Sequence, residues 1–166
     1  GEGRVWEAVL REVGAVQVEG LEELLDTALF LATLPAGRSA AGSRIAIVTT
    51  GGGSGVITAD QCARQGLQTP PPSPGTHARL RALAPPLAAI GNPIDLTPQV
   101  YTQPESFQRF GATLDAIAAD PGIDSVFVQF GPMAQRGLEV AAEVASFHAR
   151  CPKPVAVAWM LAPPGA

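Results

Sequence analysis

The chain of 166 residues has little charge and few aromatic residues, and it contains a single lysine, Lys153. Only 16% of the residues are charged and 46% are hydrophobic, which excludes a disordered chain because disorder requires high charge and few apolar residues. The formal net charge of -4 argues against nucleic acid or anionic lipid as the main partner, since both select clustered positive charge.

Two cysteines, Cys62 and Cys151, are too few for a disulfide framework or a four-ligand zinc site, so we expect a reduced, cytoplasmic setting. No apolar run approaches the ~20 residues that span a membrane, and the first residues lack a signal-peptide pattern. We therefore expect no membrane segment.

Two amphipathic helices are predicted within residues 1–35, because apolar residues recur at helical spacing over 4–13 and again over 21–32. Residues 15–18 between them favour a short strand, and the small, polar residues 36–43 favour a linker. Since the chain begins without Met and ends directly after a strand-like run, we expect it to be part of a longer protein.

From residue 44 onward, nearly all-apolar strands alternate with helical segments. The predicted strands cover 45–48, 125–130 and 155–160, with a weak one over 67–69. The predicted helices cover about 54–64, 76–83, 107–118 and 138–147. This alternation is typical of a parallel sheet with helices on both faces. Residues 44–166 are therefore interpreted as a flavodoxin-like (Rossmann-like) α/β domain, and truncation at its C-terminus is one interpretation of the ending.

A glycine cluster separates the first strand from the helix that follows it. Its residues are Thr50, Gly51, Gly52, Gly53, Ser54 and Gly55. Ligands bind at this carboxyl end of the strand in doubly wound folds. Glycines permit positive φ and let a ligand approach peptide N–H groups, while the helix N-terminus adds partial positive charge. We predict that these six residues bind phosphate or a carboxylate, through the N–H groups of about residues 53–56.

A tight turn, whose glycines only fit the helix against the strand, is the alternative interpretation of this cluster. The cluster is not a Walker A loop, because no Lys-Ser/Thr follows the glycines, and the glycine spacing also breaks the G-x-G-x-x-G pattern.

Four further residues are expected near the same sheet edge. Asn92, Asp95 and Thr97 belong to the turn-rich segment Gly91–Thr97, and Gly131 follows the strong strand over 125–130. Asp95 or Thr97 would equally suit a helix cap. No Ser-His-Asp order or metal-ligand spacing is visible, so we expect no catalytic residue, no metal site and no cofactor for this chain alone.

Two motifs resemble the NDP-forming (ADP-forming) acyl-CoA synthetases of the succinyl-CoA synthetase superfamily. Residues 44–60 are similar to the family stretch R-V-A-I-V-T-N-A-G-G-P-G-V-L-A-A-D, and residues 91–97 to G-N-P-V-D-L-T. Thr50 and Gly51 replace the usual Asn-Ala, and Ser54 replaces a frequent Pro. The resemblance covers nearly the whole chain and makes residues 1–35 the tail of a preceding domain.

The resemblance implies a part in the reaction of acid, CoA and ATP to acyl-CoA, ADP and phosphate through a phosphorylated histidine. The glycine cluster would then face phosphate or the phosphohistidine. The CoA-binding and ATP-grasp domains would be partners, and CoA, ATP/ADP and magnesium would serve the parent protein, which we expect to be bacterial. This chain contains no S-H-T-G-like histidine segment, so we expect it to be inactive alone. The alternative is a docking or regulatory module of a fused protein lysine acyltransferase or a related protein, with no phosphate site.

Overall fold

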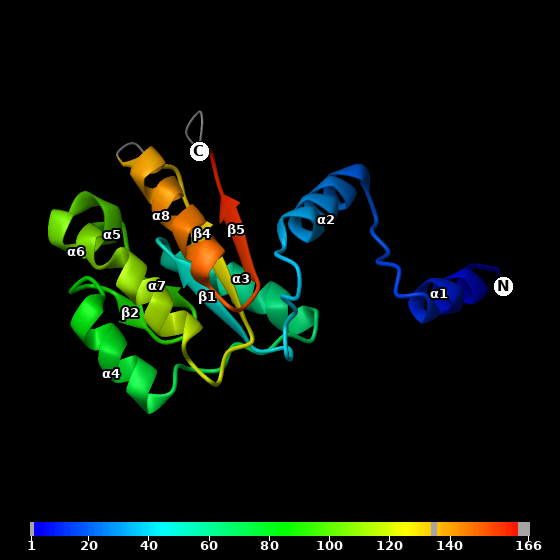
Figure 1. Ribbon diagram of the computed structural model, residues 1–166, viewed down its shortest axis with the longest axis horizontal. Coiled ribbons are helices and arrows are strands. Elements are labelled where there is room, and N and C mark those ends of the chain that lie inside the picture. Colours follow the sequence, from blue (N-terminus) through cyan, green and yellow to red (C-terminus); the bar gives the residue numbers. More distant parts are fainter. Residues whose placement is uncertain (1, 134–135, 163–166) are drawn as a thin grey trace. The chain divides into compact units, whose positions relative to one another are not determined.

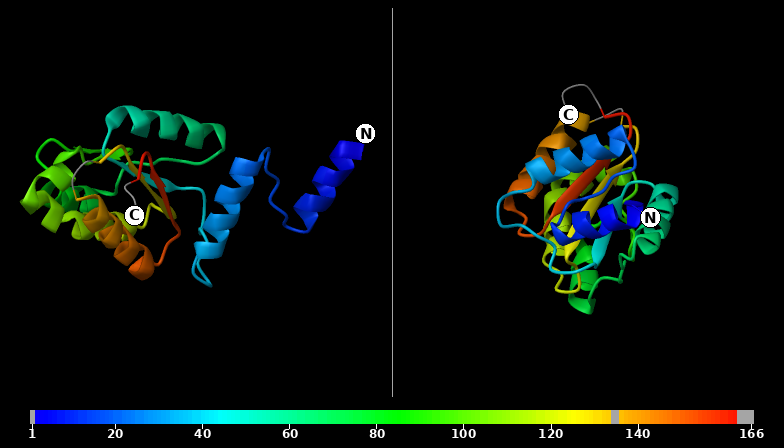
Figure 2. Two further views of the ribbon diagram at one scale, coloured as in Figure 1. Left: turned by 90° about the horizontal axis from the view of Figure 1, so that it is seen from above. Right: turned by 90° about the vertical axis from the view of Figure 1, so that its right-hand side faces the viewer.

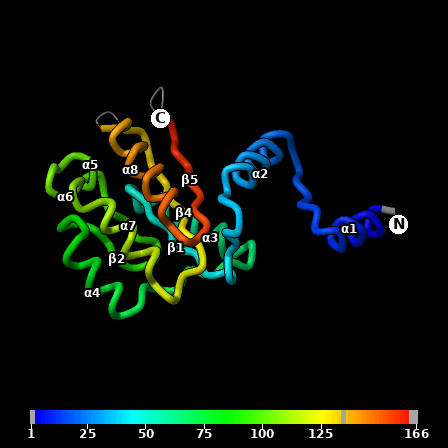
Figure 3. Tube along the Cα trace, viewed as in Figure 1, coloured from blue at the N-terminus to red at the C-terminus, as the bar shows by residue number. Residues whose placement is uncertain are grey.

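The computed structural model describes residues 2–133 and 136–162, and the chain divides into two compact units, Gly1–Pro35 and Ala36–Ala166. The first unit consists of helices α1 (Glu2–Glu12) and α2 (Leu21–Thr33), joined by an irregular segment (Figure 3). The strand expected over residues 15–18 does not form, because this unit holds no second strand to pair with it. None of the described residues of the first unit is buried.

The second unit is built on a five-stranded sheet with the strand order β2-β3-β1-β4-β5 (Figure 1). The strands are β1 (Ile45–Thr49), β2 (Ala89–Ile90), β3 (Ile94–Asp95), β4 (Ser125–Phe130) and β5 (Val155–Trp159). β1 pairs in parallel with β3 and β4, and β4 with β5, while the short β2 runs antiparallel to β3. The mostly parallel α/β sheet confirms the predicted fold class.

Helices cover both faces of this sheet. They are α3 (Gly52–Arg64), α4 (Pro74–Leu83), α5 (Gln99–Thr102), α6 (Pro104–Gln108), α7 (Phe110–Ala118) and α8 (Gly137–Arg150). Figure 2 shows α3 on one face and α8 on the other. The core forms where α7 and α8 pack on β4, and its largest side chains, Phe110, Phe130 and Phe147, are at most 2% exposed. Burying each such side chain stabilises the fold by about 1.5–3 kcal/mol.

The weak strand expected over residues 67–69 is reduced to a single bridge between Gln68 and Arg44. The side chain of Asn92 takes its place beside β1: its Oδ1 accepts a hydrogen bond from Ile47 N, and its Nδ2 donates to Ile45 O. The prolines that follow residue 69 also lack the N–H groups that a strand would need. The sequence pattern missed β2 and β3, since two residues each are too short to show a period.

Candidate functional site

The loops after β1, β3 and β4 leave the sheet at one edge. Thr49, the last residue of β1, lies opposite Asp95 in β3 and Gln129 in β4. Because these strands are parallel, the glycine cluster, the Asp95–Thr97 turn and Gly131 emerge at the carboxyl edge, where ligands bind in open α/β sheets. The strand register thus places these three loops at one edge of the sheet, as predicted.

The first turn of α3 begins inside the glycine cluster, two residues earlier than predicted. Gly51 is the N-cap residue, and its own backbone is used locally: Thr49 Oγ1 accepts from Gly51 N at 3.1 Å, and Ser54 Oγ donates to Gly51 O at 2.8 Å. Gly55 N also donates to Gly51 O, at 3.2 Å. The helix has no side-chain N-cap.

Three peptide donors are left open at this N-terminus. Within the described chain, the N–H groups of Gly52, Gly53 and Ser54 donate no hydrogen bond. The predicted donor range of residues 53–56 is therefore shifted: the open donors begin one residue earlier, at Gly52, and end before Gly55, whose N–H already donates to Gly51 O. Unpaired N–H groups and the helix dipole together attract an anion.

The four glycines of the cluster differ in what surrounds them. None of them uses the positive φ that glycine permits; Gly51, for example, is extended at φ -154. A Cβ on Gly53 would meet nothing within 4 Å, whereas one on Gly55 would lie 2.9 Å from Thr49 Cγ2 and 3.1 Å from Pro93 Cβ. Gly55 therefore fits the helix against the strand, as the tight-turn interpretation requires, while Gly53 faces open space.

Asp95 approaches the same helix end from β3. A Cβ on Gly52 would lie 3.1 Å from Asp95 Oδ2. The other carboxylate oxygen, Oδ1, accepts from Thr97 N at 2.9 Å and holds Thr97 in the left-handed region at φ 54. Asp95 thus lies beside the open donors of α3, and Thr97 shapes the turn that positions it.

Two other candidates lie differently. The side-chain amide of Asn92 is fully used by backbone groups of Ile45, Ile47 and Pro70, toward the start of β1 and away from the α3 N-terminus. Gly131 follows β4, and a Cβ there would meet nothing within 4 Å. Of the four edge candidates, Asp95 lies beside the glycine cluster, and Thr97 is tied to it indirectly through its hydrogen bond to Asp95.

Sequence reasoning missed a polar network at the opposite, amino edge of the sheet. Arg44 and Asp124 precede β1 and β4, and Arg44 binds the Asp124 carboxylate through Nε at 2.9 Å and Nη2 at 2.7 Å. This hydrogen-bonded guanidinium lowers the pKa of Asp124 to about 2. An arginine and an aspartate 80 residues apart carry no pattern that would have revealed the pair.

Asp120 joins the same edge to the N-terminus of α4. Its Oδ2 accepts from Ser73 N at 2.8 Å and its Oδ1 from Gly122 N at 2.7 Å. Burial raises the pKa of Asp120, but hydrogen bonds from Thr76, Gly122 and Ser73 outweigh it and lower the pKa overall. The acid is therefore held ionised as a structural acceptor.

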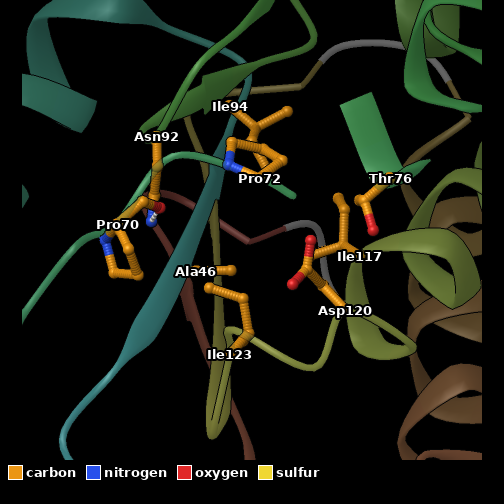
Figure 4. A pocket seen from close by; sticks show the side chains of 9 residues that line it. All are labelled: Ala46, Pro70, Pro72, Thr76, Asn92, Ile94, Ile117, Asp120 and Ile123. Carbon is orange, nitrogen blue, oxygen red and sulfur yellow. Dashed lines mark hydrogen bonds between the residues drawn. The ribbon is translucent and has the colours of Figure 1, made fainter. Parts of the chain in front are cut away.

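A small cavity lies beside Asp120, and Figure 4 shows its lining. The lining residues are Ala46, Pro70, Pro72, Thr76, Asn92, Ile94, Ile117, Asp120 and Ile123. Its volume of about 10 Å³ is that of one water molecule at most, so it does not hold a nucleotide or CoA.

Among the residues that the structure describes, no group of three or more His, Cys, Asp and Glu side chains is placed to hold a metal ion. Within the same residues, no helix is long and apolar enough to cross a membrane. Cys151 is 2% exposed and packs in the core.

The chain is similar in sequence to known CoA ligases. The model of the Ligase-CoA domain matches residues 45–158. The alpha subunit of ADP-forming acetate–CoA ligase II from Pyrococcus furiosus is 32% identical over 125 residues, which are 75% of this chain and 25% of that subunit. ADP-forming acetate–CoA ligase I from Archaeoglobus fulgidus is 30% identical over 143 residues, which are 86% of this chain and 19% of that protein.

A solved structure shares the fold. The crystal structure of PH0766 from Pyrococcus horikoshii OT3 matches with a TM-score of 0.79 at 25% identity, over 96% of this chain and 36% of that one. The chain thus spans about a third of the length of this structure and a quarter or less of the two curated relatives.

Proposed function

The chain belongs to the Ligase-CoA domain family of the ADP-forming acyl-CoA synthetases, and from this premise we propose that the N-terminus of α3 binds a phosphoryl group during the synthetase reaction. The group would be phosphate or the phosphohistidine, in the conversion of acid, CoA and ATP to acyl-CoA, ADP and phosphate. The observation that carries the proposal is the set of three open N–H donors at Gly52, Gly53 and Ser54.

Two further features support a binding role for this turn. It lies at the carboxyl edge of a parallel sheet, and Gly53 faces open space, so that an anion can approach the peptide backbone. The hydrogen bonds from Thr49 and Ser54 to the backbone of Gly51 fix the turn before any ligand arrives. A turn that is already fixed loses less conformational entropy on binding.

Asp95 determines the side from which the anion binds. Its carboxylate lies next to Gly52, and two negative charges at contact distance repel each other. The phosphoryl group therefore sits over Gly53 and Ser54, away from Asp95. Replacement of the family's Asn-Ala by Thr50 and Gly51 leaves this set of backbone donors in place, because the donors belong to the three residues that follow.

The activity of the whole protein is part of the same proposal. CoA, ATP/ADP and magnesium act on other domains, in agreement with the small share of its relatives that this chain spans. The partners of the chain are then the CoA-binding and ATP-grasp domains. The chain by itself would not form acyl-CoA, because it lacks the histidine segment that carries the phosphoryl group in the family. Cytoplasmic localisation and a bacterial origin stay predictions.

A substitution at Gly53 tests the phosphoryl site. In the complete synthetase, Gly53→Val places a side chain in the open space over the donors. Loss of one charge-assisted hydrogen bond costs about 1.5–3 kcal/mol, so we expect phosphohistidine formation to fall roughly ten- to a hundredfold. Radiolabelled ATP or phosphate measures the phosphoenzyme directly. Acyl-CoA formation from acetate and other short acids measures turnover.

Gly75→Val is the matched control. Gly75 occupies the same position in the first turn of α4, is exposed, and also has nothing within 4 Å of its Cβ position. We expect this variant to retain phosphoenzyme formation, and both variants to keep the melting temperature of the parent. If a folded Gly53→Val protein forms phosphohistidine at the rate of the parent, the cluster is only a tight turn. That result would favour the alternative of a docking or regulatory module.

A further inference from the structure

A larger cavity opens on the surface between α4 and β2, which lie side by side (Figure 1). Its volume of about 300 Å³ has room for about ten water molecules and is at the lower end of the range of small-molecule sites. Its walls consist of the apolar residues Leu80, Ala84, Pro85, Pro86, Ala88 and Ile90. The cavity is thus large enough for a small organic molecule with an apolar body.

Arg81, in the last turn of α4, adds a positive charge to this apolar lining. Among the residues that the structure describes, Arg81 forms no ion pair and its side chain donates no hydrogen bond. No Asp or Glu occurs between Asp60 and Asp95, so no acid close in sequence neutralises it. A guanidinium presents a planar fork of N–H donors that matches the two oxygens of a carboxylate. The rim of the cavity therefore offers an unpaired cation to an anionic group.

The cavity lies on the opposite face of the sheet from the glycine cluster. Ala89 of β2 lies opposite Asp95 of β3, and paired residues share a face of a sheet. Asp95 is next to Gly52 at the start of α3, so this shared face is the one that α3 covers. Ile90 points to the other face, because successive residues of a strand alternate. A ligand in the cavity would therefore not compete directly with the phosphoryl group, and the Asp95 carboxylate points away from it.

We propose that this cavity binds a monocarboxylate with a medium-length aliphatic chain. Arg81 holds the carboxylate, and the chain lies against the apolar walls and displaces water from them. Each CH₂ group that enters the cavity raises the affinity by about fourfold, so the chain supplies most of the binding and the guanidinium selects the charge. The proposal does not depend on the phosphoryl site, since it concerns a different face of the sheet.

Titration of the ¹⁵N-labelled chain with octanoate, followed by two-dimensional NMR, tests this site. We expect saturable shifts of the amides of Leu80, Arg81 and Ala88, and no such shifts with acetate, which has no chain to fill the cavity. Butanoate is four CH₂ groups shorter than octanoate, so we expect it to bind at least tenfold more weakly. Absence of saturable shifts at these amides would overturn the proposal. Equally tight binding of octylammonium would also overturn it, because an apolar patch without charge selection would then explain the result.

Two arginine substitutions on α4 separate the cavity from the general charge of the helix. Arg79 and Arg81 are both exposed, but two positions along a helix point to different sides, and of the two only Arg81 lines the cavity. Equilibrium dialysis of the complete synthetase with radiolabelled octanoate measures the affinity. We expect Arg81→Gln to lower it by about fivefold, the upper range for a solvent-exposed ion pair, and Arg79→Gln to leave it unchanged.

Equal losses in the two variants would overturn the proposal, since the charge of α4 as a whole would then attract the anion. Unchanged affinity in Arg81→Gln would overturn the assigned role of this guanidinium. Binding by the chain Gly1–Ala166 but not by the complete synthetase would show that another part of the protein covers the cavity, and would also overturn it. Unchanged NMR shifts of β4 amides in both variants of the chain verify that the domain remains folded.

Discussion

Gly55 is predicted to be a packing residue, and Gly55→Ala tests this prediction most directly. The new Cβ would lie 2.9 Å from Thr49 Cγ2 and 3.1 Å from Pro93 Cβ. Distances below 3.0 Å force a shift of the atoms, and here the neighbours are a buried threonine and a proline ring rather than the end of a flexible chain. Overpacking of this kind costs about 1–3 kcal/mol.

Gly53→Ala is the comparison within the same turn. Its Cβ meets nothing within 4 Å, and alanine in a helix is favoured over glycine by about 0.8–1.0 kcal/mol. We expect urea denaturation to give a lower midpoint for Gly55→Ala than for the parent, and an equal or higher midpoint for Gly53→Ala. Equal midpoints for the two variants would refute the assignment of packing to Gly55 and open space to Gly53.

Two further predictions concern the polar contacts of the sheet. Asn92→Ala removes three hydrogen bonds and leaves Ile47 N without its acceptor, which we expect to lower the free energy of unfolding by about 1–3 kcal/mol in urea denaturation. Retained stability would show that β1 does not need this amide. The pKa of Asp124 is lowered to about 2 by Arg44, against about 3.9 in an unfolded chain, so its stabilisation is present above pH 4 and lost as the pH falls through 2. Acid unfolding followed by circular dichroism should therefore be less steep between pH 4 and 2 for Asp124→Asn, and an unchanged curve would contradict the role of the ion pair.

The regular elements with a long, clear period were predictable from the sequence. The apolar runs at residues 45–48 and 125–130 appear as β1 and β4, because nearly all-apolar strands are stable only when both faces of a sheet are covered. Helical spacing likewise placed α1 and α2, and Gly14 ends α1 with the positive φ typical of a helix stop. The glycine cluster was placed correctly at the junction of β1 and α3, because glycine and hydroxyl residues mark such a turn locally, but its last four residues belong to the helix itself.

The roles of individual residues in that turn depended on what other segments bring to it. Gly53 and Gly55 are two positions apart, yet Pro93 crowds only Gly55, and Asp95 reaches only the Gly52 side of the helix end. The sequence predicts Asn92 to be a turn residue. In the fold its side chain forms the hydrogen bonds to β1 that a neighbouring strand would otherwise form. These contacts join positions about 40 residues apart, and no local period encodes them. The sequence by itself thus determined the alternation of strands and helices, while only the tertiary structure decided which peptide donors stay open, because that depends on the atoms that pack around them.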